Sequence, residues 1–93
     1  MKVYKQSGQI VVAACDAELL GETFEEGELI LKVTSFYDGF TCSEEELVVN
    51  LRAATSANLV GKKVIKAAIS AGFIDKDCVI KIGGVPHAQL YMI

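Results

Sequence analysis

The stretch that decides the fold runs from residue 43 to residue 72 and reads SEEELVVNLRAATSANLVGKKVIKAAISAG. Ser43 and Glu46 have the S-x-x-E spacing of a capping box, and apolar residues then recur at helical spacing. The polar pair Thr55–Ser56 interrupts this pattern, and Gly72 stands where a left-handed cap would close a second helix. The segment therefore predicts two consecutive helices, the second running through residues 57–71.

Strand-like runs flank the helical segment on both sides. Residues 3–15 predict a hairpin with its turn at Ser7–Gly8, residues 29–34 a third strand, and residues 79–82 and 88–93 two more. Because strands and helices are segregated along the chain, we expect an α+β two-layer sandwich in the order β-β-β-α-α-β-β. About five mainly antiparallel strands would carry both helices on one face. A chain of 93 residues is enough for one domain, residues 1–93.

Composition narrows the functional classes. The net charge of −3 lacks the basic excess of a nucleic-acid binder, so we do not expect strong direct binding to nucleic acid. No apolar run approaches the roughly 20 residues of a membrane span, and the first residues lack a secretion signal. Three cysteines cannot all pair with one another, which indicates reduced thiols and a cytoplasmic protein. The sequence leaves the oligomeric state open.

No pattern in the chain predicts a catalytic centre, a metal site or a cofactor. Cys15, Cys42, Cys78 and His87 are possible zinc ligands, but the nearest two, Cys78 and His87, lie nine residues apart. Structural zinc sites usually pair ligands two to four residues apart. The spacing also gives no support to a cysteine–histidine catalytic pair.

The segment Gly83-Gly84-Val85-Pro86-His87 is the most informative local pattern. Two glycines let another molecule approach the main chain, and Pro86, the only proline, makes the approach to His87 rigid. The loop could present an imidazole and free N–H groups to a ligand. The same pattern is also typical of a plain turn between the last two strands.

Two surfaces could contact a partner. Lys62, Lys63 and Lys66 lie on one face of the predicted second helix, and Leu59 falls among them, so these four residues form a candidate partner surface. An apolar end, Leu90 to Ile93, could pair with a second copy of the chain and make a homo-oligomer. The ordinary alternatives are a solvated helix face and a buried last strand.

Three segments together resemble the archaeal domain of unknown function 424 family: residues 11–16 (VVAACD, with Leu20–Gly21 following), residues 54–61 (ATSANLVG) and residues 82–89 (IGGVPHAQ). The resemblance implies a short archaeal cytosolic protein with a compact two-layer α/β fold, and it supplies no catalytic residue. It also ranks the candidate binding residues. Five residues of the third segment come first, and Asn58 of the second segment comes after them. The five are Gly83, Gly84, Pro86, His87 and Gln89.

Two functional hypotheses follow. The first is a non-enzymatic binding module that engages a protein or ribonucleoprotein partner, with translation as the suggested setting. The alternative is a small-molecule or nucleotide-binding protein, or an enzyme, that uses the Gly83–His87 loop.

Overall fold

The computed structural model describes residues 1–91, and the predicted strand residues Met92 and Ile93 lie outside the described residues. Helices, strands and short 3-10 turns (η) follow one another in this order: β1 (Lys2–Gln6), β2 (Gln9–Cys15), η1 (Ala17–Leu19), β3 (Thr23–Glu26), β4 (Leu29–Lys32), η2 (Ser35–Tyr37), α1 (Glu44–Ala53), β5 (Ser56–Val60), α2 (Lys62–Ser70), η3 (Lys76–Cys78), β6 (Ile80–Ile82) and β7 (Val85–Tyr91).

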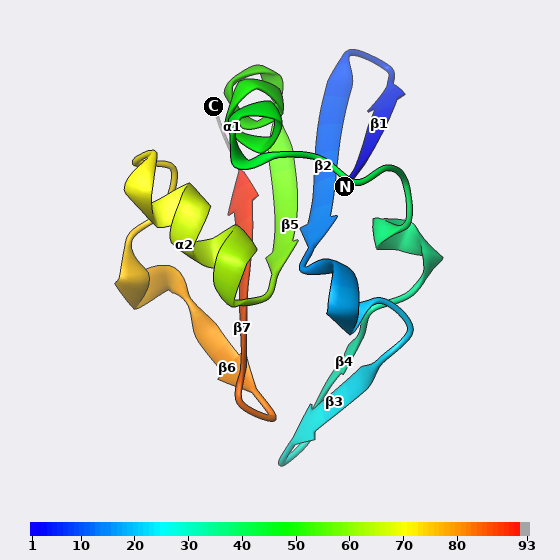
Figure 1. Cartoon of the computed structure of the whole chain (residues 1–93), viewed down its shortest axis with the longest axis vertical. Coiled ribbons are helices and arrows are strands. Elements are labelled where there is room, and N and C mark those ends of the chain that lie inside the picture. Colours follow the sequence, from blue (N-terminus) through cyan, green and yellow to red (C-terminus); the bar gives the residue numbers. More distant parts are fainter. Residues whose placement is uncertain (92–93) are drawn as a thin grey trace.

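Five of the strands form one sheet in the order β1-β2-β5-β7-β6, and β3 and β4 form a separate hairpin. The β2–β5 pairing is parallel and the other three pairings of the large sheet are antiparallel. Figure 1 shows α1 and α2 lying in front of the sheet, with the β3–β4 hairpin projecting at one end. The predicted α+β class, with two helices on one face of a mainly antiparallel sheet, is confirmed.

The helix-covered face holds the larger part of the core. Alternate residues of each central strand point to this face, as a pleated sheet requires. Val12 of β2 and Leu59 of β5 lie against Leu47 and Leu51 of α1 and against the apolar side of α2. Leu51 and Leu59 are fully buried, so this layer fixes how the helices sit on the sheet.

The opposite face has its own smaller core. Here Ala13 of β2 and Val60 of β5 contact Val33 and Tyr37 from the segment between the hairpin and α1, together with Leu31 of β4. Because both faces are covered there, β2 and β5 carry apolar residues on each side, with Asn58 in the middle of β5 as a polar residue on this face.

The helix ends match the sequence signals. Ser43 and Glu46 form a reciprocal capping box, with the Glu46 N–H donating to Ser43 Oγ at 3.2 Å and the Ser43 N–H donating to Glu46 Oε1 at 3.2 Å. At the end of α2 the Gly72 N–H donates to Ile69 O and the Phe73 N–H donates to Ala68 O, both at 3.0 Å. The predicted caps are therefore confirmed.

The prediction that residues 57–60 are helical is wrong, because they belong to strand β5 (Ser56–Val60). Its Ala57 and Leu59 are buried on the helix side while Val60 is buried on the other side, which is the period of a strand. Thr55 fixes the strand's start, since its N–H and Oγ1 both donate to Ile10 O at 2.7 and 2.9 Å. As a strand, residues 56–60 find backbone hydrogen-bond partners in the parallel strand β2, and α2 begins only at Lys62.

Leu59 is accordingly removed from the candidate partner surface. The sequence placed it among exposed lysines, but its exposed fraction is 0 % because it points from β5 into the core. Lys62, Lys63 and Lys66 lie on α2 and are exposed as predicted.

Three further boundaries differ from the predictions. The acidic segment before residue 29 contains strand β3, which pairs with β4 and was not expected. The third predicted strand ends at Lys32 instead of residue 34. The predicted loop Gly83–His87 is only a turn at Gly83–Gly84, since Val85 to His87 already belong to β7 and pair with β6.

The helices are short. The longer of the two, α1, has ten residues, and within residues 1–91 no helix is long and apolar enough to cross a membrane.

Candidate functional site

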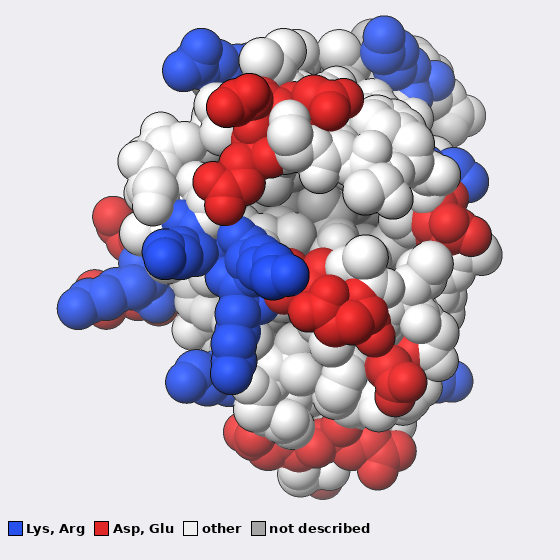
Figure 2. Space-filling view, in the orientation of Figure 1, with Lys and Arg blue, Asp and Glu red and all other residues white. Residues whose placement is uncertain are grey.

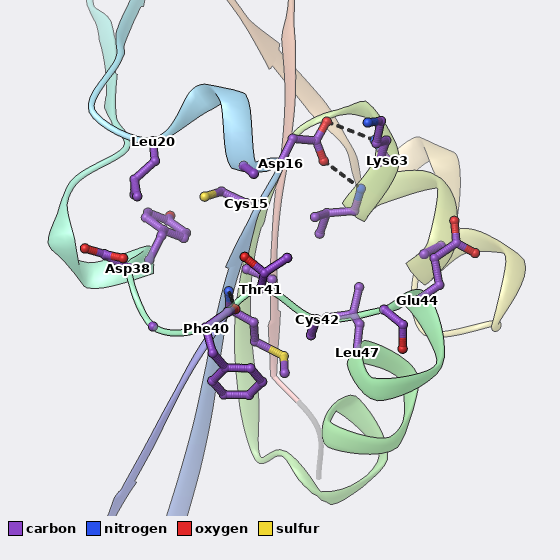
Figure 3. Close-up of a pocket in the computed structure, with 18 of the residues that line it drawn as sticks. Cys15, Asp16, Leu20, Asp38, Phe40, Thr41, Cys42, Glu44, Leu47 and Lys63 are labelled. Carbon is purple, nitrogen blue, oxygen red and sulfur yellow. Dashed lines mark hydrogen bonds between the residues drawn. The ribbon is translucent and has the colours of Figure 1, made fainter.

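A pocket of about 320 Å³ opens beside the N-terminal ends of α1 and α2 (Figure 3). Its walls are mainly apolar and include the buried side chains of Ala14, Leu47, Val64 and Ala67. These residues come from β2, α1 and α2, and the loop between η2 and α1 closes another side. The volume is at the low end of the roughly 300–1,000 Å³ typical of ligand sites, which is room for one or two large side chains.

Large apolar side chains are exposed at the mouth of the pocket. Leu20 is 39 % exposed and Phe40 is 49 % exposed, and both line the opening together with the exposed Thr41. Figure 3 shows these three side chains around the cavity. A molecule that entered the pocket would therefore also cover apolar surface that now faces water.

Asp16, at the end of β2, holds one wall of the pocket in place. Its Oδ2 accepts from the Lys63 N–H at 3.1 Å and its Oδ1 from the Val64 N–H at 3.0 Å, as the dashed lines in Figure 3 mark. The carboxylate is 7 % exposed and is the one charged side chain buried within residues 1–91. Asp16 makes no side-chain hydrogen bond to the η1 turn that follows it and caps α2, across the fold.

Gly61 makes this contact possible. It precedes α2 with a φ of 109°, and a Cβ built on it would lie 2.6 Å from Asp16 Oδ2. A side chain at this position would clash with the carboxylate and would strain the backbone, since L residues avoid positive φ. Glycine therefore allows the end of β2 to reach the first turn of α2.

The loop that closes the pocket is tied to the start of β1. The Phe40 N–H donates to Met1 O at 2.9 Å, and the Met1 amino group donates to Phe40 O at 2.9 Å. Gly39 packs against the Met1 carbonyl so closely that no Cβ would fit there. Residues 38–42 have no helix or strand of their own, so these two hydrogen bonds place them beside the pocket.

Two thiols line the pocket, those of Cys15 and Cys42. Burial is the main cause that raises the pKa of each thiol above its ordinary value. Burial also raises the pKa of the Tyr37 hydroxyl, another wall residue. The thiols are therefore protonated near neutral pH and act as small apolar groups and not as nucleophiles.

The charges around the pocket are of both signs. Glu18, Asp38 and Glu44 are exposed acidic residues that line it, and Lys63 is the lysine that reaches it. In Figure 2 the lysines of α2 gather on one side of a hollow, and acidic side chains lie on its other sides.

A family model described as a protein of unknown function (DUF424) matches residues 4–93. The chain belongs to this family. A crystal structure of an uncharacterized conserved protein from Methanopyrus kandleri has the same fold, with a TM-score of 0.84 and 24% sequence identity over 99% of this chain and 89% of that chain. A search of curated proteins found no match.

In this DUF424 chain the Gly83–His87 segment lies away from the pocket. The Gly83 N–H donates to Glu26 Oε1 at 3.2 Å, so the β6–β7 turn contacts the β3 strand. The half-buried His87 ring has its Nδ1 3.0 Å from Leu59 O. Pro86 is buried and Gly84 is exposed at the turn.

The structure brings two of the candidate binding residues, Asn58 and Gln89, into contact. They are register partners on β5 and β7, and Gln89 Nε2 donates to Asn58 Oδ1 at 2.8 Å. Both side chains are on the sheet face opposite the helices, as is His87, since Leu59 and Ala88 point to the helix side. Gln89 also borders a second, more open hollow of about 270 Å³ that includes Cys78.

The cysteines are thus divided between two places. Cys15 and Cys42 share the large pocket, whereas Cys78 and His87 lie outside it. Within residues 1–91, no group of three His, Cys, Asp or Glu side chains is placed to hold a metal ion.

Sequence reasoning missed the pocket because its walls come from segments far apart in the chain. One signal was present: Asp16 directly follows an apolar strand pattern, and Gly61 directly precedes a helix pattern. An aspartate that ends one strand and a glycine that joins the neighbouring strand to a helix could have indicated that the carboxylate caps this helix.

Proposed function

We propose that the protein is a non-enzymatic binding module that engages a protein or ribonucleoprotein partner through the pocket beside the helix N-termini. The observation that carries the proposal is a 320 Å³ opening with mainly apolar walls. Apolar concave surfaces are where partners place anchoring side chains.

The chemistry of the walls supports binding over catalysis. The raised pKa of Cys15 and Cys42 keeps their thiols protonated, and the His87 imidazole is not among the wall residues. Neither sulfur takes part in a hydrogen bond in the part of the chain that the structure describes, so neither thiol is paired with a general base there.

We further propose an archaeal origin and a cytoplasmic location. Three free cysteines suit a reducing compartment, and the neighbour of the same fold comes from Methanopyrus kandleri. Translation is the proposed setting, in which the partner would be a protein or ribonucleoprotein.

A pair of threonine variants tests the pocket as the binding surface. Thr41 is exposed at the pocket mouth, and Thr23 is exposed on β3 away from it. We expect Thr41→Phe to block the opening and Thr23→Phe to leave it free, with little effect of either on folding. A partner would be selected as a protein that co-purifies with both the wild type and Thr23→Phe.

The decisive measurement uses that partner in purified form. We expect its Kd for Thr41→Phe to be at least about tenfold weaker than for Thr23→Phe, which corresponds to about 1.4 kcal/mol. Equal Kd values for the two variants would refute the pocket as the partner site.

The lysines of α2 test the ribonucleoprotein form of the proposal. If Lys62, Lys63 and Lys66 contact phosphates, the protein should sediment with ribosomal subunits at low salt and leave them as salt rises. The triple alanine variant should stay at the top of the gradient at every salt concentration. Unchanged co-sedimentation of this variant would remove the lysines from the contact.

The alternative function, small-molecule or nucleotide binding at the Gly83–His87 segment, stays a prediction. In its disfavour, the Gly83 N–H and the His87 Nδ1 already have partners within the protein. A thermal-shift screen tests it, because a ligand at 100 times its Kd would add about 2.7 kcal/mol to the free energy of unfolding.

A further inference from the structure

The charges at the pocket suggest the kind of segment that it binds. Four carboxylates line it, and one of them, Asp16, is already paired with two N–H groups of α2. The other three, Glu18, Asp38 and Glu44, are exposed and make no hydrogen bond through their carboxylates within residues 1–91. They come from η1, the loop after η2 and the first turn of α1, so they approach the opening from different sides.

The positive charges at the pocket are fewer. The Lys63 ammonium lies on the α2 side, and the Met1 amino group is already engaged with Phe40 O at 2.9 Å. Figure 3 shows Asp38 and Glu44 on different sides of the cavity, with Lys63 beyond Asp16. A segment lying across the opening would therefore meet unpaired carboxylates on two of its sides.

The interior of the pocket requires a different chemistry from its edge. Its walls include Leu47, Val64, Ala67 and two cysteines, Cys15 and Cys42. Such walls accept an unbranched or γ-branched aliphatic side chain and reject a charged group, because an unpaired charge would lose its hydration there.

We infer that the pocket binds a short peptide segment of a protein partner in which a leucine or methionine side chain enters the cavity and flanking lysine or arginine residues pair with Glu18, Asp38 and Glu44. This inference rests on the proposed binding function and names the chemistry of the partner. Opposite charges across an interface raise the association rate and select the register of the bound segment. Leu20 and Phe40 at the mouth would be covered by the backbone of the same segment.

Cysteine alkylation supplies a direct readout on the full chain. Cys42 and Cys15 line the pocket, while Cys78 is exposed outside it and serves as an internal control. The rate of N-ethylmaleimide labelling at each cysteine would be followed by mass spectrometry, at mildly alkaline pH because buried thiols react slowly. Three peptides would be compared: one leucine between pairs of lysines, the same leucine between pairs of glutamates, and glycine between pairs of lysines.

We expect only the lysine-flanked leucine peptide to slow labelling of Cys42, by about fivefold or more at millimolar concentration, while Cys78 keeps its rate. The glycine peptide should give no protection, because charge pairing without an anchor is weak at an exposed surface. Protection by the glutamate-flanked peptide that equals or exceeds that of the lysine-flanked one would overturn the inference. Absence of protection by any of the three would do the same.

Charge-reversal variants supply the matched test. Glu18→Lys/Glu44→Lys changes two residues of the pocket edge, and Glu25→Lys/Glu28→Lys makes the same change of net charge on the β3–β4 hairpin. We expect the first variant to weaken binding of the lysine-flanked peptide about tenfold and the second to leave it nearly unchanged. Equal effects of the two variants would mean that the peptide responds to net charge alone, and the inference would fail.

The two proposals fail in different ways. If the peptide preference is absent but Thr41→Phe still loses the purified partner, the pocket binds a partner of other chemistry. If Thr41→Phe retains the partner, the binding function itself is misplaced, whatever the peptides do.

Discussion

Two regions of the molecule carry polar groups on a rigid frame, and they differ in where those groups point. At the Gly83–His87 segment the Gly83 N–H and the His87 ring contact Glu26 and Leu59 of the same chain. At the pocket, Asp16 alone is satisfied internally, and the carboxylates around it face solvent. The first region is closed by its own hydrogen bonds, and the second is left open.

The comparison shows that a rigid glycine- and proline-containing segment is not by itself an available site. Rigidity brings polar groups to fixed positions, but neighbouring strands of the same protein can already form hydrogen bonds with those groups. The pocket is open because no side chain of residues 1–91 fills the space between its apolar walls. Availability therefore depends on what the rest of the fold places opposite each group.

The largest expected change in stability is that of Gly61→Ala, because Gly61 lies against the Asp16 carboxylate that holds one wall of the pocket. We expect a loss of about 2–5 kcal/mol in the free energy of unfolding, from positive-φ strain of about 1–2 kcal/mol and overpacking of about 1–3 kcal/mol. Gly72→Ala is the control, because Gly72 also has a positive φ of 82° but nothing within 4 Å of a built Cβ. Urea denaturation measures both, and equal losses would show that the Asp16 contact adds no constraint.

A smaller effect should separate the two regions, through His87→Ala. Removing the ring leaves the Leu59 carbonyl without its partner at 3.0 Å, which should cost about 1 kcal/mol. The affinity for the purified partner, or for the lysine-flanked peptide, should not change, since His87 is not a wall residue. A variant that keeps its stability and loses binding would reverse the comparison and make the Gly83–His87 segment the site.

The smallest effect should appear in the dependence of stability on alkaline pH. Burial raises the pKa of Cys15, Cys42 and Tyr37, so in the folded state these groups hold their protons to higher pH than in the unfolded state. The contribution of the two thiols to the free energy of unfolding is fully present below the ordinary thiol pKa of about 8.5. It is lost as pH rises through the raised pKa values of the folded state. The effect is small because the two thiols are only partly buried.

Thermal unfolding between about pH 7 and about pH 10 measures this dependence across the thiol range. The Cys15→Ala/Cys42→Ala variant should lose less of its Tm over that range than the wild type. Cys78→Ala, which changes an exposed cysteine outside the pocket, should keep the wild-type profile. A profile unchanged by the double variant would contradict the assignment of the two thiols as protonated wall groups.

Much of the fold could be predicted from local patterns. The capping box at Ser43, the Gly72 cap with Phe73 and the hairpin turn at Ser7–Gly8 depend only on neighbours a few residues away, and all three are present. The apolar positions of α1 are likewise buried where its helical period placed them, at Leu47 and Leu51.

The failures occurred where a distant partner decided the structure. Residues 56–60 have an apolar pattern that fits a helix or a strand, and pairing with β2 on one side and β7 on the other selects the strand. Leu59 moved from the surface to the core with that choice. The contact of Asn58 with Gln89 likewise depends on the pairing of β5 with β7, and the sequence did not predict it.

The sequence by itself determined the fold class, the capping box of α1, the Gly72 cap of α2, the Ser7–Gly8 turn and the family, because each depends on local pattern or on residues compared in order. Only the tertiary structure decided the pocket, the cap that Asp16 gives to α2 and the burial of Leu59. The physical reason is that a cavity and a long-range cap are made by groups that chain order keeps apart. Their proximity is a property of packing, which is set only when β2, β5 and both helices meet.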